Sequence, residues 1–220
     1  RRVGNNNEAT VTILLDDQNP PAGSVDELYN ADFNGDLALP RALVPQTWPD
    51  NNLLIPGVSG DVYSLAVLTN DQTLIVGDFL SYNGYVNSIG LGYNRIALIN
   101  KDGSLDTSFN PGLGADAAIN SVTVANGNQF VIGGSFNSYD GTGCGHFARV
   151  NADGSLDLPF STQQGSGADA PVRAVAVQED GKVLIGGDFQ QVDGVPRQYV
   201  ARLNADGSLD KSFDPGDTLN

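Results

Sequence analysis

The chain has 220 residues and a formal net charge of −15. Its 11 Lys and Arg residues are too few for the clustered positive charge that nucleic acids and anionic membrane surfaces require, so neither is an expected partner. A hydrophobic content of 40%, together with 27 glycines and 11 prolines, favours many short strands joined by tight turns and therefore an all-β fold.

Several residue types are rare or absent. Cys144 is the only cysteine, which excludes an internal disulfide and any metal site with several cysteine ligands. There is no methionine, so we expect the chain to be a piece of a longer protein. No apolar run reaches about 18 residues, so no segment is expected to insert into a membrane.

The acidic residues are nearly all Asp, since Glu occurs only at positions 8, 27 and 179. Asp is common in turns, and its carboxylate is also a hard oxygen ligand for calcium. The bias therefore fits a turn-rich β fold and is compatible with a calcium-rich exterior.

Two short motifs recur along the chain and define its organisation. The motif GDF at Gly77 to Phe79 returns as GSF at 134–136 and as GDF at 187–189, while DGSLD begins at positions 102, 153 and 206. Because two independent motifs keep one period of about 50 residues, the sequence predicts three copies of a single unit.

Each unit predicts four short strands. An apolar opening strand is followed by a Gly-containing turn and by a second strand that is apolar on both faces, which indicates a place inside the sheet. A third strand ends on Asn, and a short fourth segment follows DGSLD and ends on Phe. The third strands are expected at 96–99, 147–150 and 200–203, and the fourth segments end at Phe109, Phe160 and Phe213.

Four strands in about 50 residues are typical of one β-propeller blade, whereas the rungs of a solenoid are shorter. We therefore predict a partial β-propeller of about three four-stranded blades. Because closed propellers have about 4 to 8 blades, we expect further blades in a longer parent protein, or neighbouring copies, to complete it.

Residues 172–216, VRAVAVQEDGKVLIGGDFQQVDGVPRQYVARLNADGSLDKSFDPG, resemble the delta-60 repeat, a bacterial propeller-type repeat of large secreted and surface proteins. The resemblance covers three copies, at 61–112, 118–165 and 171–216, within a repeat region at 61–220. The first copy departs from the pattern, because Leu98 stands where the others have Arg149 and Arg202. The resemblance implies an extracellular or cell-surface location.

The segment before the repeats resembles part of another domain. Residues 8–20, EATVTILLDDQNP, look like the last strand of a Calx-beta domain, an immunoglobulin-like sandwich. We therefore assign 1–19 to the end of such a domain and 20–60 to a connection with a degenerate closing motif at 23–30. In that family, acids that close the last strand help to bind calcium. The resemblance implies that Asp16 and Asp17 are Ca²⁺ ligands, with the remaining ligands upstream of Arg1.

Other candidate site residues have structural explanations. Asp102, Asp153 and Asp206 are expected to form turns, because an EF-hand-like loop needs an acid where Leu98, Arg149 and Arg202 stand. Cys144 and His146 share a Gly-rich, exposed-looking loop in one copy only, so we expect loop residues and no nucleophile or zinc site. Arg149 and Arg202 are expected to pair with Asp157 and Asp210, and Tyr82 and Tyr139 to serve packing.

These observations favour a non-enzymatic structural or adhesive repeat module of a large secreted or cell-surface bacterial protein. Its expected partners are other domains of the parent protein or neighbouring copies. The alternative is a glycan- or protein-binding propeller that uses the variable loops at 80–94, 137–145 and 190–198. An enzyme is disfavoured because no acid-base or nucleophile constellation recurs, and Ca²⁺ is the only cofactor expected.

Overall fold

The structure, a computed structural model, describes residues 57–82, 92–163, 165–214 and 216. Its elements are β1 (Asp61–Val67), β2 (Thr73–Asp78), β3 (Ile96–Ile99), β4 (Ile119–Val124), η2 (Asn126–Asn128), β5 (Phe130–Gly134), β6 (Ser138–Tyr139), β7 (Thr142–Gly143), β8 (Phe147–Val150), α1 (Leu158–Gln163), β9 (Val172–Val177), β10 (Val183–Gly187), β11 (Gln191–Val192), β12 (Val195–Pro196) and β13 (Val200–Leu203). The described chain is thus built from short strands, as the composition predicts.

The strands form three antiparallel sheets of the same design. We name them sheet 1 (β1-β2-β3), sheet 2 (β4-β5-β8) and sheet 3 (β9-β10-β13). In each sheet the second strand in sequence lies in the centre, which confirms the prediction from its apolar character on both faces. The third strands have the bounds that the sequence predicts.

Two small hairpins follow the central strands of sheets 2 and 3. Strand β6 pairs with β7, and β11 pairs with β12. The two-residue turns are Asp140-Gly141 and Asp193-Gly194, and all four residues have φ between 46° and 74°. This left-handed conformation suits Asp-Gly and gives the tight turn whose twist matches a hairpin.

The predicted fourth strand is wrong, because each sheet has three strands. The segment after DGSLD makes a single bridge in each unit, Ile99 with Leu105, Val150 with Leu156, and Leu203 with Leu209. In the second unit the chain then turns into α1 and not into a strand. The Asp157 carboxylate accepts a hydrogen bond from the Phe160 amide at 3.3 Å, as an N-cap does, and so favours a helix start.

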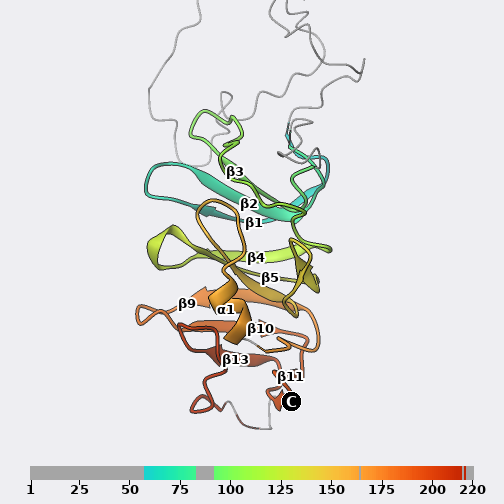
Figure 1. Cartoon of the computed structure of the whole chain (residues 1–220), viewed down its shortest axis with the longest axis vertical. Helices are drawn as coiled ribbons and strands as arrows, with labels where there is room; N and C mark the ends of the chain where they lie inside the picture. Colours follow the sequence, from blue (N-terminus) through green and yellow to red (C-terminus); the bar gives the residue numbers. More distant parts are fainter. Residues whose placement is uncertain (1–56, 83–91, 164, 215, 217–220) are drawn as a thin grey trace, which may run out of the picture.

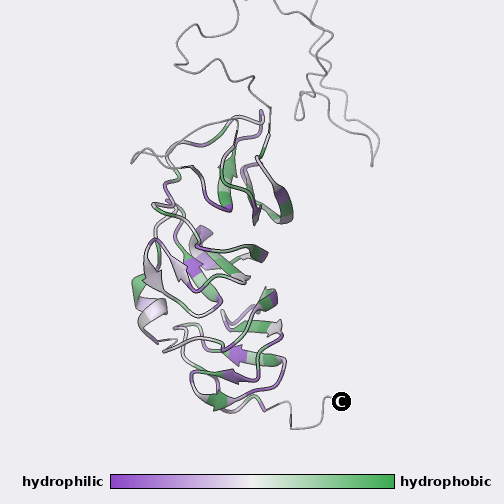
Figure 2. Cartoon of the chain, turned by 90° about the vertical axis from the view of Figure 1, so that its right-hand side faces the viewer, coloured by the Kyte–Doolittle hydropathy of each residue, from purple (hydrophilic) through white to green (hydrophobic). Residues whose placement is uncertain are grey.

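The sheets stack on one another along the long axis of the molecule (Figure 1), and apolar residues are concentrated on their strands (Figure 2). One buried cluster joins sheets 1 and 2, with Leu74 and Ile132 as members, and a second joins sheets 2 and 3, with Val131 and Ile185. Each interior boundary is therefore an apolar core between two units.

The N-terminal predictions lie outside the described residues. They comprise the Calx-beta-like segment 1–19, the closing motif at 23–30 and most of the connection 20–60, and they stay predictions. Among the residues that the structure does describe, no helix is long and apolar enough to cross a membrane.

Candidate functional site

The most regular polar feature is an aspartate at the end of DGSLD in every unit. We call Asp106, Asp157 and Asp210 the closing aspartates. Each accepts a hydrogen bond from the residue directly before the central strand: Gln72 donates to Asp106 at 2.7 Å, Gln129 to Asp157 at 2.9 Å, and Lys182 to Asp210 at 2.9 Å. The closing aspartate therefore ties the last segment of the unit to its central hairpin.

Two of the closing aspartates also pair with an arginine, as predicted. Arg149 Nε lies 2.7 Å from Asp157, and Arg202 Nε lies 3.0 Å from Asp210. Each guanidinium also covers an aromatic ring, 4.4 Å from the centre of Phe160 in the second unit. In the third unit the corresponding distance to Phe213 is 4.8 Å. Both arginines therefore make structural contacts within their own unit.

The surroundings of Asp106 and Asp210 favour the ionised form of each carboxyl. Burial raises the pKa of Asp106, but hydrogen bonds from Ser108 and Gln72 outweigh it, so the net pKa is lowered. Hydrogen bonds from Ser212 and Lys182 hold the pKa of Asp210 far below its usual value, with a further contribution from Arg202. A carboxylate held in this way is a fixed anchor and a poor proton donor.

The first aspartate of DGSLD forms a turn in all three units, which confirms the turn interpretation. Asp102 Oδ1 accepts hydrogen bonds from both the amide and the hydroxyl of Ser104, at 3.0 and 2.6 Å. Asp153 and Asp206 repeat these bonds with Ser155 and Ser208. The side-chain bond from serine is the main cause of the lowered pKa of all three carboxyls.

Sequence reasoning missed a second recurring aspartate. Asp116 accepts hydrogen bonds from the amides of Asn137 and Ser138, at 2.8 and 3.1 Å. Asp169 does the same for residues 190 and 191, and Ser59 takes this place in the first unit. The motif Gly-Ala-Asp, present at 114–116 and at 167–169, was the available signal.

Cys144 and His146 do not form a reactive pair. Cys144 is 2% exposed, which corrects the expectation of an exposed loop, and burial raises the pKa of its thiol to about 12. Burial also lowers the pKa of His146, against the opposing effects of the Ser135 backbone, Asp116 and Asp169. At neutral pH the thiol is protonated, so it is a poor nucleophile.

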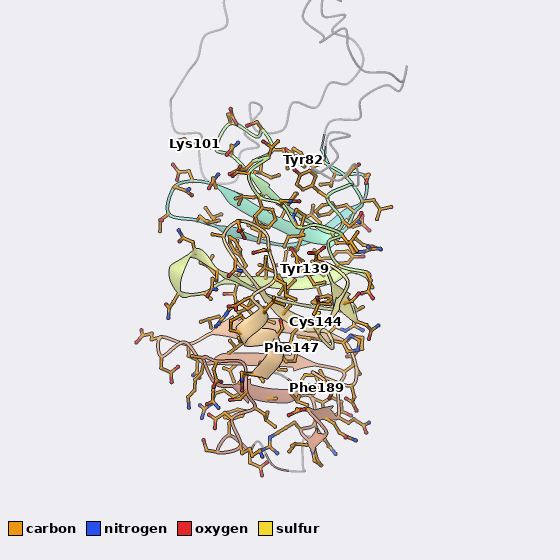
Figure 3. The ribbon with its side chains drawn as sticks, viewed as in Figure 1. Tyr82, Lys101, Tyr139, Cys144, Phe147 and Phe189 are labelled. Carbon is orange, nitrogen blue, oxygen red and sulfur yellow. The ribbon has the colours of Figure 1, made fainter. Side chains whose placement is uncertain are left out.

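The two recurring tyrosines serve packing, as predicted. Tyr139 is fully buried and its hydroxyl donates to the Gly154 carbonyl at 2.8 Å. Tyr82 repeats this contact with Gly103 at 2.6 Å. Figure 3 places Tyr139 within the stack, together with Cys144 and Phe147. Neither ring is available for stacking on a sugar.

A hollow and the side chains that could bind a metal are the other possible sites in the described part of the chain. One shallow hollow of about 440 Å³ is lined by Arg149, Pro159, Phe160, Gln163 and Asp206. Its arginine is already held by Asp157 and Phe160. Within the described ranges, no three His, Cys, Asp or Glu side chains come together as a metal site would require. Asp16 and Asp17 lie outside those ranges, so the calcium site stays a prediction.

Three like sheets, closed by the same hydrogen bonds, are the organisation of a repeat protein. The family model described as "Domain of unknown function (DUF5122) beta-propeller" matches residues 69–109, 128–160 and 178–213, which together make up half of the chain. The chain therefore belongs to this family of β-propeller-type repeat proteins.

One of the solved structures that match the chain is similar at low identity. It is the crystal structure of a protein of unknown function from Bacteroides caccae, 12% identical, with a TM-score of 0.38 over 68% of this chain. The aligned region spans 65% of that protein's length. No curated protein matches the chain.

Proposed function

We propose that the chain is a non-enzymatic structural or adhesive module, built from delta-60 repeats, of a large secreted or cell-surface bacterial protein. The observation that carries this proposal is that the recurring polar side chains make their contacts within the chain. The closing aspartates, the turn aspartates and the Asp116 position all bind other groups of the same chain. Polar residues that are kept from unit to unit thus hold the unit together.

The reactive side chains support the same interpretation. Cys144 and His146 each occur once, whereas the scaffold occurs three times, and the Cys144 thiol is buried with a raised pKa. A catalytic group needs access to substrate and a pKa suited to its task. The described residues offer no such group next to a deep pocket, which favours a scaffold role.

Location is the direct test. Intact cells that make the parent protein would be treated briefly with protease, and the released peptides identified by mass spectrometry. We expect peptides from residues 57–214 in the released fraction, and none from a cytoplasmic control protein. Recovery of the chain only after lysis, in soluble and unattached form, would contradict the proposal.

The alternative proposal is a glycan- or protein-binding propeller. It is favoured by the exposure of the β6-β7 and β11-β12 tips, where the turns at 140–141 and 193–194 share Asp-Gly but the exposed residues that follow differ, such as Gly143 and Pro196. The test is a glycan array with the immobilised chain, and then with chains in which loops 137–145 and 190–198 are exchanged. A change of glycan specificity when the loops are exchanged supports this alternative. An array without hits would exclude glycans as the ligand.

A further inference from the structure

The outer face of sheet 1 exposes apolar residues whose equivalents in sheet 2 are buried. On β1, Val62, Leu65 and Val67 are 42%, 57% and 62% exposed. The equivalent residues of β4 include Ile119 and Val122, which are 0% and 8% exposed. They lie in the cluster that joins sheets 1 and 2. The same row of side chains is therefore an inter-sheet contact in one place and is open in the other.

The strand register fixes this equivalence. In each unit the first residue of the row pairs with the glycine of the GDF or GSF motif: Val62 with Gly77, Ile119 with Gly134, and Val172 with Gly187. We call the side that carries this row the leading face of a sheet, and the opposite side the trailing face. At both interior boundaries the leading face of one sheet packs on the trailing face of the sheet before it.

Sheet 3 carries an uncovered trailing face at the other end of the stack. In sheet 2 the trailing face is very close to its neighbour, because a side chain at Gly133 would collide with Val172 and Val175. Gly186 is the equivalent residue of sheet 3. A side chain there would meet only the Tyr199 carbonyl oxygen, at 3.7 Å. Sheet 3 thus keeps the glycine that permits close docking, with nothing among the described residues docked on it.

Arg202 is also suited to a following unit. Arg149 pairs with Asp157, covers Phe160, and reaches across the boundary to donate to the Ala205 carbonyl of the next unit at 2.7 Å. Arg202 repeats the first two contacts within its own unit. The third contact needs the turn of a further unit, such as the carbonyl of Lys101, which is equivalent to Ala205 in the Asn-x-Asp-Gly turn. Lys101 lies at the sheet 1 end of the stack (Figure 3).

We propose that a second copy of this chain docks the leading face of its sheet 1 on the trailing face of sheet 3, head to tail. The two open faces are the two halves of a contact that the chain already makes twice between its own sheets. In this arrangement Val62 and Leu65 of one copy pack over Gly186 of the other. The guanidinium of Arg202 then donates to the Lys101 carbonyl across the interface.

One hydrogen bond of the interior boundaries is missing from this interface. The Val122 amide donates to Ser64 across the first boundary at 3.3 Å, and the Val175 amide donates to Ser121 across the second at 3.2 Å. The third unit has Ala174 in place of serine, so the Leu65 amide of a second copy finds no hydroxyl there. We therefore expect the contact between copies to be weaker than the interior ones.

This inference extends the proposed structural role by naming a partner, and its failure is distinguishable from failure of that role. The test of location reports where the parent protein resides, whereas self-association is measured on the purified chain. A monomeric chain on the cell surface would overturn only the inference.

The test is sedimentation equilibrium of the full chain. The wild-type protein is expected to show a mass above that of the monomer, increasing with concentration, and more so at high salt, because salt screens the repulsion between copies of charge −15. Leu65→Lys blocks the leading face, and Gly186→Arg blocks the trailing face. Each variant alone should associate at least about tenfold more weakly, since a charge is buried against apolar side chains. Mixed together they should form a 1:1 pair and nothing larger, because one intact face of each kind remains.

Leu158→Lys is the matched control. Leu158 is 57% exposed, as Leu65 is, and the charge change is the same, but it lies on α1 away from both end faces. This variant should associate as the wild type does. A wild-type chain that stays monomeric up to about 1 mM would overturn the proposal. So would a loss of thermal stability in monomeric Leu65→Lys, because the face would then be covered within its own chain.

Restoring the missing hydrogen bond gives an independent readout. Ala174→Ser should tighten self-association on the order of fivefold, the effect of one neutral hydrogen bond. The gain should disappear in the Leu65→Lys background. Equal affinity of the wild type and Ala174→Ser would contradict the proposed register.

Discussion

Sheets 2 and 3 have similar sequences but differ in what covers their trailing faces. Val131 of sheet 2 is fully buried beneath sheet 3, whereas the equivalent Leu184 of sheet 3 is only partly buried. Complete burial of an aliphatic side chain contributes about 1.5 to 3 kcal/mol. The stability that an aliphatic side chain contributes in this fold therefore depends on whether a neighbouring sheet covers it.

The largest effect is expected on the leading faces, where sheet 2 is covered by its neighbour and sheet 1 is exposed. Ile119→Ala removes a fully buried side chain between sheets 1 and 2 and should lower the free energy of unfolding by about 3 kcal/mol. Val62→Ala changes the equivalent position of sheet 1, which is 42% exposed, and should cost less than about 0.5 kcal/mol. Urea unfolding at low protein concentration measures both. Similar losses would mean that a segment of the same chain covers the sheet 1 face.

The closing aspartates allow a second comparison, between units with and without arginine. Asp157→Asn leaves the largely buried Arg149 without its counter-charge and should cost about 2 kcal/mol. Asp106→Asn leaves no cation unpaired, since Leu98 replaces the arginine, and should cost about 1 kcal/mol or less.

Arg149→Leu, which copies the first unit, provides the control for the aspartate variants. Combined with Asp157→Asn, it should recover at least half of the loss, because the unpaired charge is gone. Urea unfolding of the single and double variants measures the coupling. Additive losses would show that the ion pair does not explain the cost of the aspartate change.

The glycines of the trailing faces allow a third comparison. Gly133→Ala forces a methyl group against Val172 and Val175 and should cost about 1 to 3 kcal/mol. Gly186→Ala meets open space and should leave the unfolding free energy unchanged or raise it by about 0.5 kcal/mol, since alanine restricts the unfolded chain. The measurement is urea unfolding of dilute monomer. A loss in Gly186→Ala equal to that in Gly133→Ala would contradict the open trailing face.

Much of this architecture could be predicted from the sequence because local pattern determines it. The apolar character of 74–76, 130–132 and 183–185 placed these strands in the sheet centres, and the first Asp of DGSLD placed the turn after each third strand. The pairing of Arg149 with Asp157 also followed, since each position recurs in a second unit. A repeat displays its structural residues more than once, so they can be separated from incidental ones.

The sequence predictions were wrong where the structure depends on tertiary contacts, or where a feature is not repeated in all three units. The fourth strand was predicted from the similarity of the DGSLD segments, but only a bridge forms, and the Asp157 cap leads into α1. Cys144 lies in a Gly-rich loop that looks exposed in sequence, yet the fold buries it. The Asp116 position was missed because serine replaces aspartate in the first unit. The calcium prediction for Asp16 and Asp17 lies outside the described residues.

The smallest effect concerns a titratable group that only sheet 2 carries. His146, Arg95 and Tyr199 occupy one left-handed position before the third strand, with φ of 73°, 68° and 65°. Burial lowers the pKa of His146 below 6.5, while the Ser135 backbone, Asp116 and Asp169 oppose the shift. The folded state therefore favours the neutral ring.

The sign of the pH dependence follows from this lowered pKa. The stabilisation is fully present above pH 6.5 and is lost as the pH falls from there towards the folded pKa. Because the ring is partly exposed, solvent screening keeps the change below about 0.5 kcal/mol. Urea unfolding at about pH 7.5 and about pH 5.5 should show this loss in the wild type but not in His146→Asn, since Asn tolerates a positive φ. The Asp169 carboxyl, whose pKa is lowered, affects stability only below pH 3.8 and cannot produce the same signal. An equal loss in His146→Asn would assign the effect to titratable groups other than His146.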